Sequence, residues 1–127
     1  MKMYKNKNKK IILLDFDGTL HKYTTKFTHE THIHDEPIDG AIQFVKDLFD
    51  AGFQVVIFSS RGSHSEFGLY ANDWFAKYGL DKCYIDMLQY SNVKGPHDVI
   101  LDDRAWNFDG NYPEVSELMA FRPWNKR

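Results

Sequence analysis

The chain has 127 residues, of which 43% are hydrophobic and 16% aromatic, so it is large enough for one domain with a packed core and too small for two. This composition argues against a disordered chain, and no apolar run reaches the roughly 18 residues that a membrane span needs. Cys83 is the single cysteine, which excludes an intrachain disulfide, and the apolar run Ile11–Leu14 is too short for a signal peptide. We therefore expect a soluble, cytoplasmic protein.

The net charge of −2 is distributed unevenly along the chain. Five lysines and no acid lie in residues 1–10, so residues 11–127 carry a net charge of −7, from 11 basic and 18 acidic side chains. A basic tail on an acidic domain is poorly suited to gripping a long nucleic acid over a broad face. We expect residues 1–10 to form a flexible tail and residues 11–127 to form a single domain, and a nucleic-acid partner is not favoured.

The first predicted elements are a strand and a flap. The unbroken apolar run Ile11–Leu14 is typical of a strand buried on both faces. Residues 21–36 then alternate with a period of two, which predicts an extended or hairpin-like flap. In this flap His29 would face the opposite side from His32 and His34.

Helices and strands then alternate along the chain. Apolar residues at helical spacing between Pro37 and Gly52 predict a helix, and residues 53–58 predict a second buried strand. The next helix carries an aromatic stripe over residues 67–78, which we assign to the core, with Ser63 and Glu66 as a capping box.

The last part of the chain completes the pattern. We expect a weak strand around Tyr84–Tyr90, a clear strand at Val99–Leu101 and a short helix near Pro113–Phe121. This order predicts an α/β fold with an open, mostly parallel sheet, in which ligands bind beyond the carboxyl ends of the strands.

Polar residues gather at three of those predicted strand ends. They are Asp15 and Asp17 after the first strand, Ser59 after the second, and Asp102 and Asp103 after the last. Carboxylates at one edge of a sheet repel one another unless a cation lies between them, and oxygen ligands favour Mg²⁺ over zinc.

This set of residues suits phosphoryl transfer. A carboxylate can attack phosphorus and form an aspartyl-phosphate, while a second acid moves the proton of the leaving group and then of water. A hydroxyl and a lysine, which Ser59 and Lys94 are placed to supply, would hold the phosphoryl oxygens together with the metal.

The segments "DFDGTL", "IFSSR", "VKGP" and "VILDDRA" resemble, in order, the four motifs of the haloacid dehalogenase superfamily, over about Ile11 to Phe108. The resemblance implies a Rossmann-like three-layer sandwich and a Mg²⁺-dependent phosphohydrolase. The linkers leave no room for a cap domain, so we expect a capless member with a short flap after the first strand.

The resemblance also implies a role for each motif residue. Asp15 would be the nucleophile and a metal ligand, and Asp17 the general acid and base, with its backbone carbonyl on the metal. The other roles go to Ser59 and Lys94, which would hold the phosphoryl group, to Asp102 with Asp103 for the metal, and to Thr19 and Arg61 as further substrate-binding candidates. Because Asp17 is present, an oxygen leaving group is favoured over a halide.

Several alternatives stay open at this stage. Lys82 competes with Lys94 as the phosphate lysine, and Arg61 is as well suited to pairing with an acid as to binding substrate. Ser59 could instead cap a helix, and Arg104 is better suited to bracing the Asp-Asp turn than to chemistry.

The flap histidines favour a polar surface over an adventitious metal site, and His21 or another flap residue is suggested to contact substrate. For the function, a phosphate monoester is the expected substrate. A module that processes phosphate ends of nucleic acid and a non-catalytic regulator that binds Mg²⁺ or phosphate are the alternatives. The oligomeric state is left open.

Overall fold

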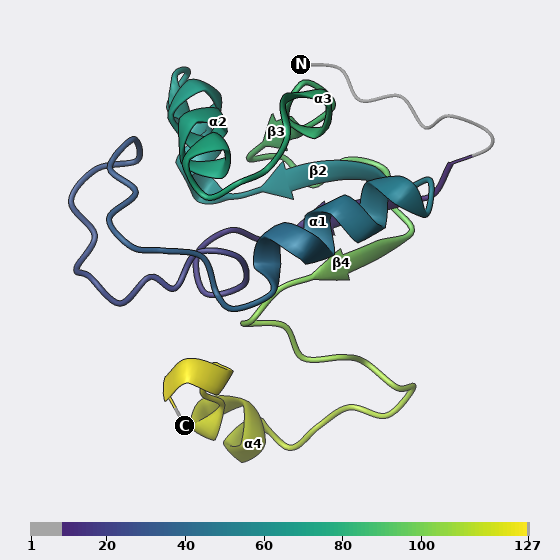
Figure 1. Cartoon of the computed structure of the whole chain (residues 1–127). Helices are drawn as coiled ribbons and strands as arrows, with labels where there is room; N and C mark the ends of the chain where they lie inside the picture. Colours follow the sequence, from purple (N-terminus) through teal and green to yellow (C-terminus); the bar gives the residue numbers. More distant parts are fainter. Residues whose placement is uncertain (1–8, 127) are drawn as a thin grey trace.

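A computed structural model describes residues 9–126 of the chain. Its centre is a four-stranded, all-parallel sheet with the strand order β3-β2-β1-β4 (Figure 1). The strands are β1 (Ile11–Leu14), β2 (Gln54–Phe58), β3 (Gln89–Ser91) and β4 (Val99–Leu101). The predicted α/β class with a parallel sheet is thereby confirmed. The predicted flexibility of residues 1–10 concerns mostly residues 1–8, which lie outside the described part of the chain.

Strand β1 lies in the middle of the sheet because it is apolar at every position. Leu13 is in register with Val56 of β2 on one side and with Ile100 of β4 on the other. Each residue of β1 is at most 4% exposed. Such a strand satisfies its backbone groups on both edges and buries side chains on both faces.

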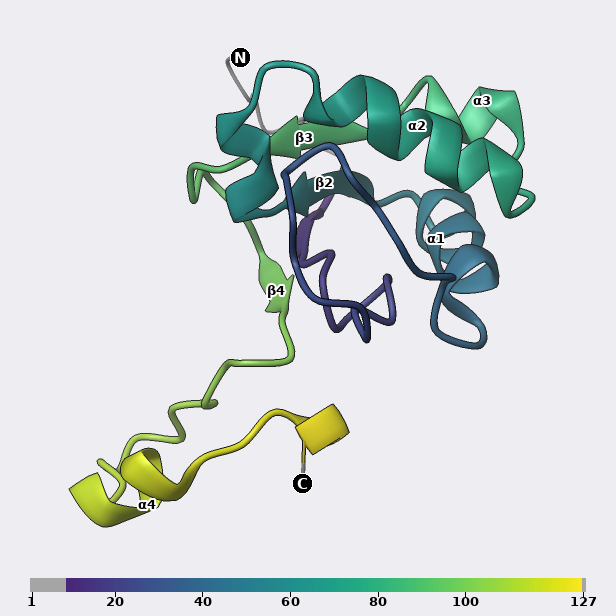
Figure 2. The same cartoon turned by 90° about the vertical axis from the view of Figure 1, so that its left-hand side faces the viewer.

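One face of the sheet is covered by helices α1 (Ala41–Asp50), α2 (Phe67–Lys77) and α3 (Lys82–Ile85). The side chains of Ile12, Leu14, Val55 and Ile57 pack there against buried residues of α1 and α2. Figure 2 shows the three helices together on the same side of the sheet. The predicted aromatic stripe of α2 is core at Phe67 and Trp74, whereas Tyr70 is exposed.

The other face carries a smaller apolar cluster of Ile11, Leu13 and Val56. Within residues 9–126 no helix residue packs against this cluster, so the second helical layer of the expected three-layer sandwich is not seen. The reason lies in the connection from β3 to β4, which has to pass from one edge of the sheet to the other. A right-handed crossover takes that connection over the face opposite α1 and α2, and here residues 92–98 form it without a helix.

After β4 the chain runs away from the sheet before it returns. Helix α4 (Val115–Ala120) buries none of its side chains, and the short helix η2 (Trp124–Lys126) follows it. Figure 2 shows this segment, in green to yellow, extending from β4. No helix in the described part of the chain combines the length and apolar character that a membrane span needs.

Two predictions about helices and strands were wrong. The region predicted as a strand around Tyr84–Tyr90 contains helix α3, and only its end, with Ser91, forms β3. The predicted capping box is absent, because Glu66 is itself the N-cap of α2 and its N–H donates to His64 Nδ1 (3.1 Å).

The flap also departs from its predicted alternation. It forms only isolated bridges at its two ends, which His21 makes with Asp17 and Pro37. A turn in which the N–H of His32 donates to the carbonyl of His29 (3.0 Å) brings the two rings within 5.2 Å of each other. His29 and His32 therefore do not lie on opposite sides.

Candidate active site

A cavity of about 290 Å³ lies at the carboxyl edge of the sheet. In Figure 1 the strands point toward this edge, with the flap, drawn in purple to blue, beyond their ends. The residues that line the cavity are Asp15, Asp17, Tyr23, Ser59, Ser60, Asp102, Asp103, Arg104, Asn125 and Lys126. The structure therefore brings together all four candidate aspartates and Ser59.

Three of the aspartates form a compact oxygen cluster. One carboxylate oxygen from each of Asp15, Asp102 and Asp103 lies within 4.8 Å of the other two. Burial raises the pKa of Asp15 to about 8, and a hydrogen bond with Asp103 and the charge of Asp102 add to the rise. The carboxyl is thus held in a place where its negative charge is unfavourable without a cation.

The cluster fits a divalent cation with oxygen ligands. Asp103 Oδ1 is buried and has no hydrogen-bond partner within the described residues, which is costly for a carboxylate oxygen unless a cation fills the gap. The donors are all carboxylate oxygens, a set that suits Mg²⁺ better than zinc. The backbone carbonyl of Asp17 as a further ligand stays a prediction.

The turn after β1 brings these groups close together. Gly18 has φ +82°, and a Cβ at this position would collide with Asp103 Oδ2, so glycine is required for this close approach. Thr19 Oγ1 donates to Asp15 Oδ2 (3.2 Å), which places Thr19 behind the predicted nucleophile. The Gly-Thr pair of the first motif thus has a structural role on each side of the carboxylate cluster.

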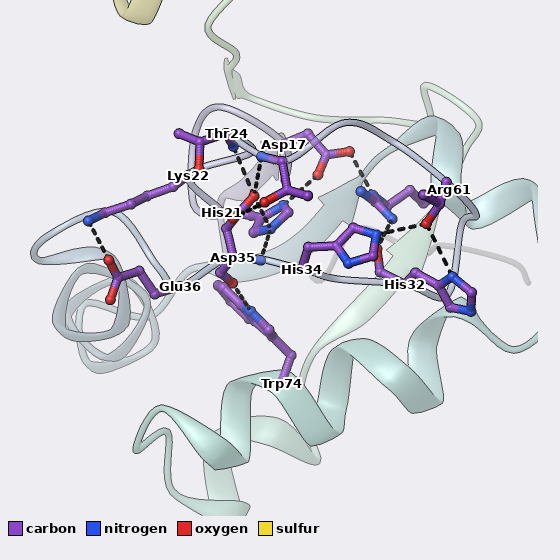
Figure 3. A network of polar contacts seen from close by, with 12 residues as sticks. Asp17, His21, Lys22, Thr24, His32, His34, Asp35, Glu36, Arg61 and Trp74 are labelled. Atoms are coloured by element: carbon purple, nitrogen blue, oxygen red, sulfur yellow. Dashed lines mark hydrogen bonds and ion pairs between the residues drawn. The ribbon is translucent and has the colours of Figure 1, made fainter.

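The carboxylate of Asp17 is held on both oxygens. His21 Nδ1 lies 2.8 Å from Oδ1, and Arg61 Nε donates to Oδ2 (2.7 Å) (Figure 3). Burial by itself raises the pKa of Asp17, but the hydrogen bonds from His21 and Arg61 and the charge of Arg61 together lower it below its ordinary value.

The protonation of His21 follows from its second nitrogen. His21 Nε2 accepts the backbone N–H of Asp35 (3.0 Å), so it carries no proton, and the ring is the neutral tautomer with its proton on Nδ1. The side chain is 1% exposed. His21 therefore donates to Asp17 instead of facing the cavity.

Arg61 connects Asp17 to the flap. Besides its bond to Asp17, its Nη1 donates to three flap carbonyls, those of His29 (3.1 Å), Glu30 (3.0 Å) and His32 (3.2 Å). Its guanidinium carbon also lies 5.1 Å from the centre of the Phe27 ring. The side chain is 1% exposed, and Arg61 takes the acid-pairing arrangement that the sequence left open.

Ser59 combines the two arrangements considered for it. It lines the cavity and is 6% exposed. Its Oγ also accepts the N–H of Arg61 (3.2 Å) as the N-cap of the short helix η1 (Ser60–Ser63). A hydroxyl that accepts one bond still has its proton to donate to an anion.

Neither candidate phosphate lysine lines this cavity. Lys94 is exposed in the connection between β3 and β4, and Lys82 pairs with Asp86 on the surface. The cations that do line it are Arg104, whose N–H braces Asp102 Oδ1 (2.8 Å), and Lys126. Sequence reasoning missed Lys126. The only sequence feature that could have indicated it is a lysine two positions after the apolar pair Pro123 and Trp124.

The histidines form a surface cluster beside the site. The ring centres of His29 and His64 are 5.0 Å apart, and those of His32 and His34 are 6.0 Å apart. Over residues 9–126, the three-aspartate cluster is the one group whose ligand atoms are close enough for a metal. Comparisons of the chain with protein-family profiles, with curated proteins and with solved structures found no match.

Proposed function

We propose that the chain is a Mg²⁺-dependent phosphohydrolase of the haloacid dehalogenase type that cleaves a phosphate monoester. One observation carries the proposal: the clustered carboxylates of Asp15, Asp102 and Asp103, with Asp17 beside them, line one cavity at the carboxyl edge of a parallel sheet. The strand order β3-β2-β1-β4 supports the finer assignment, since Rossmann-like sheets begin with this order.

In the first step an oxygen of Asp15 attacks phosphorus, and the bond from phosphorus to the ester oxygen breaks. This forms an aspartyl-phosphate, and the departing oxygen takes a proton from Asp17. Ser59 Oγ–H and the backbone at the end of β2 would hold the phosphoryl oxygens. Asp17 must first take up a proton from water, to which its side chain is 18% exposed, and a carboxyl with a lowered pKa then donates that proton readily. His21, the neutral tautomer, keeps its N–H and holds the Asp17 carboxyl in place.

In the second step Asp17, again a carboxylate, accepts a proton from water, and the water oxygen attacks phosphorus. The bond between Asp15 and phosphorus then breaks, and inorganic phosphate leaves. When bound to Asp15, Asp102 and Asp103, Mg²⁺ would neutralise the charge that grows on the phosphoryl oxygens.

A second candidate is a non-catalytic protein that binds Mg²⁺ and phosphate on the same scaffold. It is favoured by one observation, because both oxygens of Asp17 are already engaged, one by His21 and one by Arg61. The alternative of processing phosphate ends of nucleic acid relies on the lysines of residues 1–10, of which only Lys9 and Lys10 are in the described part of the chain.

The test is phosphate release from a chromogenic aryl phosphate, with Mg²⁺ and with chelator. We expect Mg²⁺-dependent release from the wild type and a loss of at least about 10³-fold in Asp15→Asn. Asp73→Asn, at an exposed position of α2, is the matched control and should keep full activity. A wild-type protein that binds Mg²⁺ and releases no phosphate from any of a panel of esters would contradict the proposal and favour the non-catalytic protein.

A further inference from the structure

The candidate cavity has an unbalanced charge for a site that is to hold a phosphate. Four carboxylates line it, and a bound Mg²⁺ would offset only two of their charges. A phosphoryl group carries up to two negative charges of its own, so it needs a further cation on the side away from the metal. Arg61 does not line this cavity, and its Nε and Nη1 already donate to Asp17 and to the flap carbonyls.

A segment far away in the sequence supplies such a cation. Residues 123–126, which we call the Trp124 hook, follow the segment in which the chain runs from α4 back toward the rest of the molecule (Figure 2). Asn125 and Lys126 of the hook line the same cavity as Asp15.

The hook is anchored on the first motif itself. Trp124 Nε1 donates to the carbonyl of Gly18 (2.8 Å), across 106 positions of the sequence. The Trp124 side chain also borders a depression with Ile38 and Leu101, and Pro123 is buried. The N–H of Lys126 donates to the carbonyl of Pro123 (2.9 Å), which closes the turn that directs the hook to the cavity.

From these contacts we propose that Lys126 is the lysine that binds the phosphoryl oxygens, and that Trp124 is the positioning residue that holds it there. The proposal rests on the proposed function and assigns a residue to the phosphate-binding task for which sequence reasoning selected Lys94. Both lysines are exposed, but Lys94 lies outside the cavity, whereas Lys126 lines it.

Lysine suits this position chemically. Its ammonium group is a compact charge with three donors on a flexible stem, so it can follow the phosphoryl group through a change of geometry. Arg104, the other cation of the cavity, directly follows Asp102 and Asp103 in the sequence and is therefore placed to offset their charge. Lys126 reaches the cavity from a different segment, the short helix η2.

The experiment uses the full chain and two independent readouts. Titration calorimetry measures the binding of inorganic phosphate in the presence of saturating Mg²⁺, and separately the binding of Mg²⁺ alone. The variants are Lys126→Met, Lys94→Met for the competing residue, Trp124→Phe for the loss of the indole N–H, and Lys77→Met as an exposed control on α2.

We expect Lys126→Met to weaken phosphate binding and to raise KM for the aryl phosphate by about 10- to 100-fold, the contribution of one charge-assisted hydrogen bond, with Mg²⁺ affinity unchanged. Trp124→Phe should produce a smaller loss in the same direction. Wild-type values within twofold for Lys126→Met, or a loss that appears only in Lys94→Met, would overturn the proposal.

The two proposals fail in different ways. If the wild type hydrolyses no ester but binds phosphate through Lys126, the hydrolase proposal fails and the assignment of Lys126 stands. If the wild type hydrolyses esters and Lys126→Met is indistinguishable from it, only the assignment of Lys126 fails. If the wild type with Mg²⁺ binds no phosphate, the assignment of Lys126 is wrong.

Discussion

Asp15→Asn should stabilise the metal-free protein at alkaline pH, although it removes the proposed nucleophile. The carboxyl of Asp15 is buried beside Asp102 and Asp103, which raises its pKa from the usual 3.8 to about 8. Asparagine has nearly the same shape and carries no charge. It can keep the hydrogen bond that Thr19 Oγ1 donates to Asp15 Oδ2 (3.2 Å).

The sign of the effect follows from proton binding. Between pH 4 and 8 the unfolded chain has lost the Asp15 proton while the folded protein still holds it, so wild-type stability falls as the pH rises through this range. The full pKa shift would correspond to about 5 to 6 kcal/mol, and the partial solvent exposure of Asp15 reduces this to about 2 kcal/mol. Asp15→Asn has no carboxyl to ionise at this position, so its stability should not fall in this way as the pH rises.

The assay is thermal unfolding in chelator at pH 5 and pH 8. Wild type and Asp15→Asn should melt at similar temperatures at pH 5, and at pH 8 the variant should melt about 6 to 10 °C higher. Mg²⁺ at 100 times its Kd should stabilise the wild type by about 2.7 kcal/mol and the variant by much less. Asp73→Asn, the exposed control, should follow the wild type throughout.

Two results would refute this reasoning. One is a variant that is no more stable than the wild type at pH 8 in chelator, which would mean that the Asp15 carboxyl is not destabilised by its surroundings. The other is equal stabilisation of both proteins by Mg²⁺, which would place the cation elsewhere.

Three further substitutions test the architecture of the site. Gly18→Ala should weaken Mg²⁺ binding at least about tenfold, because the added Cβ would meet Asp103. The control is Gly40→Ala, where φ is +86° but the added Cβ would meet no atom within 4 Å, and which should cost about 1 kcal/mol of stability and leave Mg²⁺ binding intact. Calorimetry measures the Mg²⁺ binding and thermal melts measure the stability. Arg61→Met should release the flap and destabilise the fold by about 3 kcal/mol or more, because Arg61 donates to three flap carbonyls. Limited proteolysis would detect the release as new cleavage within residues 22–36. An unchanged digest would contradict the role of Arg61 in holding the flap. Val45→Ala, at a fully buried position of α1, should lower the free energy of unfolding by about 2 kcal/mol in a denaturant titration, and a change under 0.5 kcal/mol would argue against the packing of α1 on the sheet.

Much of the sheet was predictable because its signals are local. The apolar runs at Ile11–Leu14 and Val99–Leu101 became β1 and β4 with the predicted ends, and helical spacing identified α1. The flap was predicted less well. Its alternation was taken for extended structure, whereas its conformation depends on bonds to Arg61 and Trp74, which lie far away in the sequence.

The candidate site was likewise predicted where local patterns specify it and missed where long-range contacts do. The sequence by itself determined that Asp15, Asp17, Asp102 and Asp103 would meet at one edge, because residues that follow parallel strands in one sheet must lie together. Only the tertiary structure decided that Arg61 clamps the flap to Asp17 and that Trp124 brings Lys126 into the cavity, while Lys94 stays outside. The physical reason is that strands and helices are encoded by residues a few positions apart, whereas these contacts join segments up to 106 positions apart, and no local pattern specifies them.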